Sequence, residues 1–245
     1  MAQSSYQPRT YRQRMSAEGL VGFRVIVKET DLHIQAGRDL SEEAEEAVVA
    51  AREMLERHIA AHPEFRDSLE PLSVPGPLPA LLQAMYEAAR RAGVGPMAAV
   101  AGAVAEYVGR ELLKHSEEVI VENGGDIFLA TKIERVVAVE AGKSPLSGKV
   151  GLRIPAGSVL GICTSSGTVG PSLSFGKADA ALIIAEDAAF ADAAASTLGN
   201  RVQTPADIEG ALEHMRELPG ILQALVVIED KLGTWGQYEL TRLAG

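Results

Sequence analysis

Alternation of apolar and polar residues is the first regular pattern in the chain, and it begins at Gly22. Residues 23–28 alternate, Glu29-Thr30-Asp31 is typical of a turn, and residues 32–35 are apolar at every second position. Two alternating runs joined by a short polar turn indicate paired strands. The pattern therefore predicts a β-hairpin over residues 22–36.

A helical period replaces the alternation after residue 38. Apolar side chains then recur at spacings of three and four, which places them on one face of a helix: Ala44, Ala47, Val48, Ala51, Leu55 and Ile59. We expect Asp39 to cap this helix, with Glu42 completing a capping box. We expect the helix to end at His62, because Pro63 disfavours helical geometry at the preceding residue.

Residues 71–79 contain four prolines, which predict a rigid connector inside the domain, since composition does not change across it. Helices are expected over 80–92 and 97–114. The second begins with the small residues of segment 95–103, Gly-Pro-Met-Ala-Ala-Val-Ala-Gly-Ala. Small side chains allow another backbone or a ligand to approach closely.

The remaining patterns are mainly those of strands. We expect strands over 118–122, 126–131, 135–140, 150–154, 159–163, 180–185, 224–229 and 237–241, and helices over 188–198 and 205–217. Because strands and helices come in blocks, the pattern favours an α+β fold over a doubly wound sheet. We expect one domain over residues 1–245, with residues 1–15 as an extended N-terminal arm.

Composition narrows the setting of the protein. Apolar residues make up 47% of the chain and Cys163 is the single cysteine, so a disulfide framework is excluded and a reducing compartment is expected. Residues 1–10 lack the pattern of a secretory signal, and no apolar run approaches the ~20 residues that cross a bilayer. These features predict a soluble, cytoplasmic protein without a membrane partner.

The net charge of −10 argues against a nucleic-acid partner, because such proteins carry a basic stripe. The basic cluster present, Arg9, Arg12 and Arg14, is interpreted as a solvated or subunit-contacting tail. Aromatic residues make up only 4% of the chain, which also disfavours stacking on single strands.

Asn123-Gly124-Gly125-Asp126 lies between two apolar runs, and Asn-Gly there indicates a hairpin turn because both residues tolerate positive φ. Successive glycine amides in such a turn can also form an anion-binding nest. Asp126 or Glu122 would then hold a hydroxyl or a cation.

Hydroxyls and glycines follow the strand that ends at Cys163: Thr164, Ser165, Ser166, Gly167 and Thr168. Such a loop is either a structural Ser/Thr turn or a binding loop for a phosphate group or for the edge of a ligand's ring. We interpret Cys163 as a buried small residue rather than a nucleophile. Lys177 and Asp179 follow Gly176, but the glycine that a phosphate-binding P-loop places five residues before its Gly-Lys pair is replaced by Pro171.

Asp192 and Ser196 are four residues apart on an expected helix and therefore share a face. A carboxylate with a hydroxyl suits magnesium, which takes few protein ligands and fills its shell with phosphate oxygens and water. The alternative is a helix-end acid and a serine bonded back to its own helix. His58 and His62 have the spacing of a helical metal pair, but a third ligand is missing, so we expect them in a solvated helix end, as we do His115 and His214.

Together these segments resemble the ApbE-like superfamily, best known for flavin transferases that move FMN from FAD to a protein threonine or serine. Residues 123–126 are similar to its Asn-x-Gly-Gly-Asp-type turn, and residues 164–167 to its Thr-Ser-Gly loop. Residues 191–196 are similar to its Ala-Asp-Ala-x-Ala-Thr helix. Segments 93–102, 121–126 and 164–179 look like signatures of a shorter, uncharacterised branch.

The resemblance implies an α+β fold with duplicated helix-on-antiparallel-sheet subdomains of the T-fold type. It also implies Mg²⁺ ligands at Asp192 and Ser196, with a carbonyl near Val100 as a third, and FAD or FMN as cofactor. The transferases' lysine is missing from the corresponding stretch 101–106, and their histidine after the Thr-Ser-Gly loop is not found. Three functions stay open: flavin-nucleotide binding or FMN transfer, an accessory role in sulfur or amino-acid metabolism with a small anionic metabolite, and a non-catalytic oligomeric scaffold. A homo-oligomer, such as a dimer, fits all three.

Overall fold

A large antiparallel sheet forms the centre of the protein. The computed structural model describes residues 17–167 and 175–243. Within them, eight strands pair in the order β1 (Val21–Val27), β2 (Thr30–Ala36), β3 (Val119–Asn123), β4 (Asp126–Ala130), β7 (Val159–Ser165), β8 (Ala180–Ala185), β9 (Ile221–Ile228) and β10 (Lys231–Gly236). A smaller sheet pairs β11 (Leu240–Arg242), β6 (Val150–Ile154) and β5 (Arg135–Ala138).

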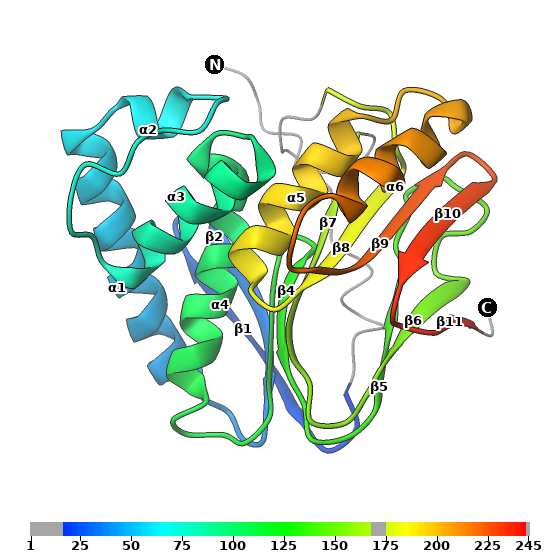
Figure 1. Ribbon diagram of the computed structural model, residues 1–245. Helices are drawn as coiled ribbons and strands as arrows, with labels where there is room; N and C mark the ends of the chain where they lie inside the picture. The colour runs from blue at the N-terminus through cyan, green and yellow to red at the C-terminus, as the bar shows by residue number, and fades with distance from the viewer. Residues whose placement is uncertain (1–16, 168–174, 244–245) are drawn as a thin grey trace.

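The helices cover one face of the large sheet, and the small sheet lies on its other side (Figure 1). The helices are α1 (Ser41–Ala61), α2 (Glu64–Asp67), α3 (Ala80–Ala92), α4 (Val100–Leu112), α5 (Ala188–Asn200) and α6 (Ile208–Arg216), with 3₁₀ turns η2 (Pro96–Ala99) and η3 (Pro205–Asp207). Side chains alternate between sheet faces, so each face has its own apolar cluster. Val119, Val121 and Phe128 face the helices, whereas Ile120 and Leu129 face the small sheet.

The order of elements recurs along the chain. The hairpin β1–β2, the helices α1 to α4 and the hairpin β3–β4 form one half of the large sheet. The pair β7–β8, the helices α5 and α6 and the hairpin β9–β10 form the other half. The predicted α+β class is confirmed, whereas the duplication of subdomains stays a prediction.

Most predicted elements are present, and the bounds of α3, β6 and β8 match those expected from sequence. The strand predicted over 237–241 is wrong. The chain forms β10 before it and β11 from Leu240, because Gly236, at φ 137°, ends the pairing with β9. None of the helices in the described ranges is long and apolar enough to span a membrane.

The start of α1 also differs from its prediction. The helix begins at Ser41 with Leu40 as its N-cap residue, and no side chain caps it. Asp39 instead accepts hydrogen bonds from the amide and hydroxyl of Ser41, so the capping box with Glu42 does not form. The end of the helix is as predicted, with His62 as its C-cap.

His58 is buried rather than solvated, which corrects its prediction. Its side chain is 7% exposed, and its Nε2 lies 3.0 Å from the hydroxyl of Tyr86 on α3. Phe65 packs edge-on against the imidazole with ring centroids 4.8 Å apart. Burial, reinforced by neighbouring His62 and opposed by Glu64, lowers the pKa of His58. Neutral His58 therefore links α1 to α3 through its hydrogen bond with Tyr86.

We expect this histidine to make stability depend on pH. Because its folded pKa lies below the unfolded value, the unfolded chain takes up the proton first as pH falls through about 6.5, and the free energy of unfolding decreases. His58→Phe should lose about 1–2 kcal/mol at pH 8, since the Tyr86 hydroxyl loses its partner. It should also have a shallower loss between pH 7 and 5 in urea titrations. Equal slopes in both proteins would contradict the assignment, and His115→Gln, which replaces an exposed histidine, serves as the control.

Candidate functional site

The β3–β4 turn is the first part of the candidate site. Asn123 and Asp126 form the last pair of the hairpin, and Gly124 and Gly125 lie between them with φ of 72° and 114°. The predicted hairpin is confirmed, but its two central residues are the glycines and not Asn-Gly. Positive φ at both positions costs glycine little, which explains why this pair occupies the turn.

Asn123 and Asp126 lie on the helix-covered face of the sheet, because they alternate in step with Val121 and Phe128. The Asn123 side-chain amide donates to the carbonyl of Ala101 at the start of α4, at 3.1 Å. The turn is thereby tied to the small-residue segment that begins α4.

Asp192 approaches the same segment from α5. Its Oδ2 accepts a hydrogen bond from the Gly102 amide at 2.9 Å. This amide belongs to the first turn of α4, whose N–H groups lack partners within the helix. Asp192 therefore acts as an acceptor for the start of α4, a role that differs from both sequence-based interpretations of this residue.

The negative charge of Asp126 acts on Asp192 here. Loss of hydration raises the pKa of Asp192 well above its usual range, and the charge of Asp126 raises it further, while the amides of Gly102 and Ala101 act in the opposite direction. Like charges in a poorly hydrated place cannot both ionise cheaply. Repulsion between the two carboxylates therefore makes the charged form of Asp192 unfavourable.

Cys163 lies close to this pair and is buried, as predicted. Its Sγ lies 3.4 Å from the carbonyl of Ala188, to which the thiol donates. Burial first, and then the charges of Asp126 and Asp192, raise its pKa well above that of a free thiol. The thiol stays protonated and is a poor nucleophile, since the thiolate is the reactive form.

The end of β7 divides its hydroxyls between the two faces of the sheet. Ser165 lies on the helix side, with its Oγ near the backbone of Gly199 on α5. Thr164 pairs with Leu182, whose side chain belongs to the opposite cluster, so Thr164 faces away from Asp192. Ser166 and Gly167 continue beyond the strand, with the Gly167 amide donating to the Ala178 carbonyl at 2.9 Å. Thr168 lies outside the described residues.

Lys177 and Asp179 stand further along the same end of the sheet. Lys177 is exposed, and its amide donates to the carbonyl of Val202. Asp179 Oδ2 accepts from the Glu229 amide at 2.7 Å, which engages this carboxylate in the β9–β10 turn. The side chain of Lys177 is thus accessible to a ligand, whereas Asp179 has a structural role in the β9–β10 turn.

A row on α5 connects these parts. Asp192, Ser196 and Gly199 follow at spacings of four and three and share one face of the helix. Asp192 meets the start of α4 beside the β3–β4 turn and Gly199 meets Ser165, with half-buried Ser196 between them. The turn, the end of β7, the start of α4 and α5 are therefore neighbours in the structure, and their role as a ligand site stays a prediction. In the described part of the chain, no group of three or more His, Cys, Asp or Glu side chains can hold a metal.

Glu106 was assigned no role from sequence. Its Oε2 accepts from the Ala188 amide at 2.7 Å, so it caps α5 from α4, and it also pairs with Arg110. The two helices therefore exchange acceptors: Glu106 of α4 holds the start of α5, and Asp192 of α5 holds the start of α4. No local pattern in the sequence indicated this exchange, because the partners lie 82 and 90 residues apart.

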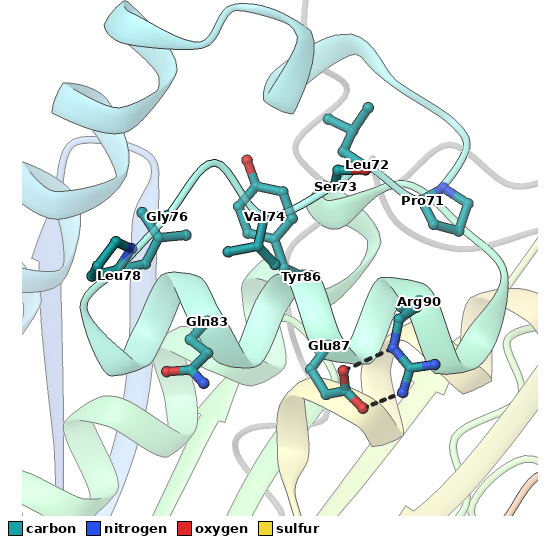
Figure 2. A pocket seen from close by; sticks show the side chains of 11 residues that line it. Pro71, Leu72, Ser73, Val74, Gly76, Leu78, Gln83, Tyr86, Glu87 and Arg90 are labelled. Carbon is teal, nitrogen blue, oxygen red and sulfur yellow. Dashed lines mark hydrogen bonds and ion pairs between the residues drawn. The ribbon is translucent and has the colours of Figure 1, made fainter.

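A pocket elsewhere contains none of the predicted site residues. It encloses about 640 Å³ between the proline-rich connector and α3, where Gln83, Tyr86, Glu87 and Arg90 line it (Figure 2). Its two charged side chains are paired with each other, Arg90 Nε to Glu87 Oε2 at 2.9 Å. The pocket is therefore separate from the site around Asp192.

Comparison with solved structures defines the class of protein by its fold. An ApbE protein of Thermotoga maritima aligns over 87% of this chain and 96% of its own with a TM-score of 0.53. The flavinyl transferase ApbE of Pseudomonas stutzeri aligns over 88% of this chain and 93% of its own, with a TM-score of 0.54. The flavin transferase ApbE of Vibrio cholerae aligns over 88% of this chain and 96% of its own, with a TM-score of 0.55. Identities are 13–14%, so the likeness concerns the fold alone.

The sequence places the chain within this class. It belongs to the family described as AbpE bacteria, whose model matches residues 12–230. A UPF0280 protein of Methanocella arvoryzae is 40% identical over 213 residues, covering 86% of each chain. A UPF0280 protein of Methanoculleus marisnigri is 45% identical over 199 residues, covering 80% of this chain and 79% of its own. The predicted membership of an uncharacterised ApbE-like branch is confirmed.

The contact of α4 with α5 should not tolerate a side chain at Gly102. A Cβ there would lie 2.1 Å from the carbonyl oxygen of Ala188 and 2.8 Å from Cβ of Asp192. Gly102→Ala should therefore destabilise the protein by about 1–3 kcal/mol despite the higher helix propensity of alanine. Gly210→Ala on α6, where a Cβ meets nothing within 4 Å, is the control and should stabilise by up to about 1 kcal/mol. Chemical denaturation measures both, and a neutral Gly102→Ala would contradict the close approach.

The strained carboxylate pair predicts an unusual effect of Asp192→Asn. A carboxyl whose folded pKa is raised contributes most to stability at low pH, and this contribution is lost as pH rises above about 4. Asparagine keeps an oxygen for the Gly102 amide but carries no charge. In metal-free buffer we expect Asp192→Asn to melt at a higher temperature than the wild type at pH 8, with the difference shrinking towards pH 4. A lower melting temperature at pH 8 would show that the two carboxylates do not repel each other.

Proposed function

We propose that the protein binds a flavin nucleotide, FAD or FMN, together with Mg²⁺ where the β3–β4 turn and the end of β7 meet α4 and α5. The observation that carries this proposal is the carboxylate of Asp192, which lies against the start of α4 and is near enough to Asp126 for that second negative charge to raise its pKa. A bound divalent cation would neutralise the repulsion that raises the pKa of Asp192.

The donor set fits magnesium better than zinc or calcium. Magnesium keeps several waters and needs one or two carboxylates together with the phosphates of its ligand. Asp192 and Ser196 are the proposed metal ligands, with Asp126 opposite them. The absence of a third acidic, histidine or cysteine ligand among the described residues is compatible with this chemistry, because phosphate oxygens complete the shell.

The remaining part of the ligand would lie along the loop side. Ser165 would supply a hydroxyl near α5, Ser166 would supply a second one just beyond the strand, and exposed Lys177 would supply a positive charge. Hydroxyls and a cation are the groups that receive phosphate oxygens. Asn123 and Asp126 would meet the ligand from the turn. This arrangement supports a phosphorylated ligand that extends from the turn towards the β7 loop.

Nucleotide binding, rather than FMN transfer, is the central claim. Two of the structures similar in fold are named flavin or flavinyl transferases. This chain has no lysine in segment 101–106, and its acidic residue there, Glu106, is engaged by the Ala188 amide and Arg110. Transfer of FMN to a threonine-containing peptide is therefore an outcome to be measured beside binding, and mass spectrometry of the peptide detects it.

Titration calorimetry with FAD, with and without Mg²⁺, tests the proposal. We expect Mg²⁺ to strengthen FAD binding by the wild type at least about tenfold, because the cation bridges carboxylates and phosphates. Asp192→Asn should lose most of this gain while remaining folded. Glu111→Gln, an exposed acid at the far end of α4, is the matched control and should behave like the wild type.

FAD and FMN binding that is absent, or insensitive to both Mg²⁺ and Asp192→Asn, would refute the proposal. A thermal-shift panel then separates the alternatives, because a true ligand stabilises in proportion to the logarithm of its concentration over Kd. Stabilisation by a small sulfur-containing or amino-acid anion alone would favour the accessory role. A concentration-dependent oligomer without any ligand effect would favour the scaffold.

A further inference from the structure

Glu122 is a buried acid that the proposed ligand set does not use. Its side chain is 1% exposed, and it lies on the small-sheet face of β3, in step with Ile120. Its Oε1 accepts a hydrogen bond from the Gly125 amide at 3.0 Å. A buried carboxylate is costly unless it is hydrogen-bonded, so this contact is built into the fold rather than accidental.

The contact reaches the turn from the side opposite to the ligand groups. Asn123 and Asp126 face the helices, whereas Glu122 bonds the turn from the other face of the sheet. Gly124 and Gly125 both have positive φ and no side chains, so they restrict the turn little by themselves. An anchor for the Gly125 amide therefore restricts the conformation of the whole turn.

Glu122 also changes what the turn can bind. A nest of free glycine amides would attract an anion. Here the Gly125 amide is already paired with a carboxylate, and that carboxylate adds negative charge behind Asp126. The turn is therefore suited to a cation or to ligand hydroxyls, not to a phosphate group.

We propose that Glu122 is a positioning residue that fixes the β3–β4 turn so that Asn123 and Asp126 face the ligand, and that it excludes phosphate from the turn amides. This inference rests on the proposed function for the ligand, but the hold on Gly125 is a property of the chain alone. It assigns the cation and hydroxyl side of the ligand to the turn and the phosphate side to the β7 loop.

The Gly125 amide gives a direct readout of the anchor. In ¹H–¹⁵N spectra of the ligand-free protein, a charge-assisted hydrogen bond moves its proton downfield and slows its exchange. Glu122→Gln keeps an oxygen acceptor without the charge, so the resonance should move upfield by a small amount. Glu122→Leu removes the acceptor, so the resonance should move further and exchange faster. An unchanged Gly125 resonance in Glu122→Gln overturns the anchor even if the leucine variant does not fold.

Binding of FAD with Mg²⁺ gives the second readout. Glu122→Leu should weaken it about tenfold, and Glu122→Gln should restore it to within about threefold of the wild type. Gln35→Leu is the matched control: it removes a buried polar side chain from the same sheet face, where Gln35 accepts from the Ala17 amide, and should leave the affinity unchanged.

The outcomes separate this inference from the proposed function. If the wild type binds FAD and Glu122→Leu binds it equally well, the positioning role is overturned and the function stands. If the wild type binds no flavin nucleotide, the proposed function is refuted. The Gly125 resonance alone then decides whether the hydrogen bond from Gly125 to Glu122 fixes the turn. Inorganic phosphate that perturbs the Gly125 amide of the wild type would overturn the exclusion of phosphate.

Discussion

The close approach of α4 to the start of α5 is the constraint on which the site depends. It requires bare backbone on two sides of Ala188: a Cβ on Gly102 of α4 would lie 2.1 Å from the Ala188 carbonyl oxygen, and one on Gly161 of β7 would lie 2.3 Å from the Ala188 Cα. At this distance each helix start takes an acceptor from the other helix, through Glu106 and Asp192. The contact therefore fixes the position of Asp192 relative to the β3–β4 turn.

Acceptors dominate the turn side of this site. The amides that a glycine-rich turn and a helix start offer are bonded to the protein's own carboxylates, Gly125 to Glu122 and Gly102 to Asp192. Such an arrangement leaves negative charge in a poorly hydrated place, and a cation is the natural complement. Donors gather instead towards the end of β7 and Lys177, where an anionic part of a ligand would be neutralised.

The likeness to ApbE structures at 13–14% identity shows how little of the sequence this fold needs. A three-layer arrangement needs apolar alternation on two sheet faces and small residues where helices cross. Site chemistry is less tolerant, because it needs particular side chains at particular places. Glu106 illustrates this, since its carboxylate is committed to the α5 amide and to Arg110 in this chain.

The sequence alone determined most of the strands and helices and the α+β class, because alternation and helical period are local; α3, β6 and β8 were predicted to the residue, whereas β10 was missed. It also predicted the residues 123–126 turn and the Asp192–Ser196 face. Only the tertiary structure decided which amide each carboxylate bonds, that Thr164 faces away from Asp192, and that His58 is buried against Tyr86. These facts depend on segments up to 90 residues apart coming together, and no local period in the chain encodes such contacts.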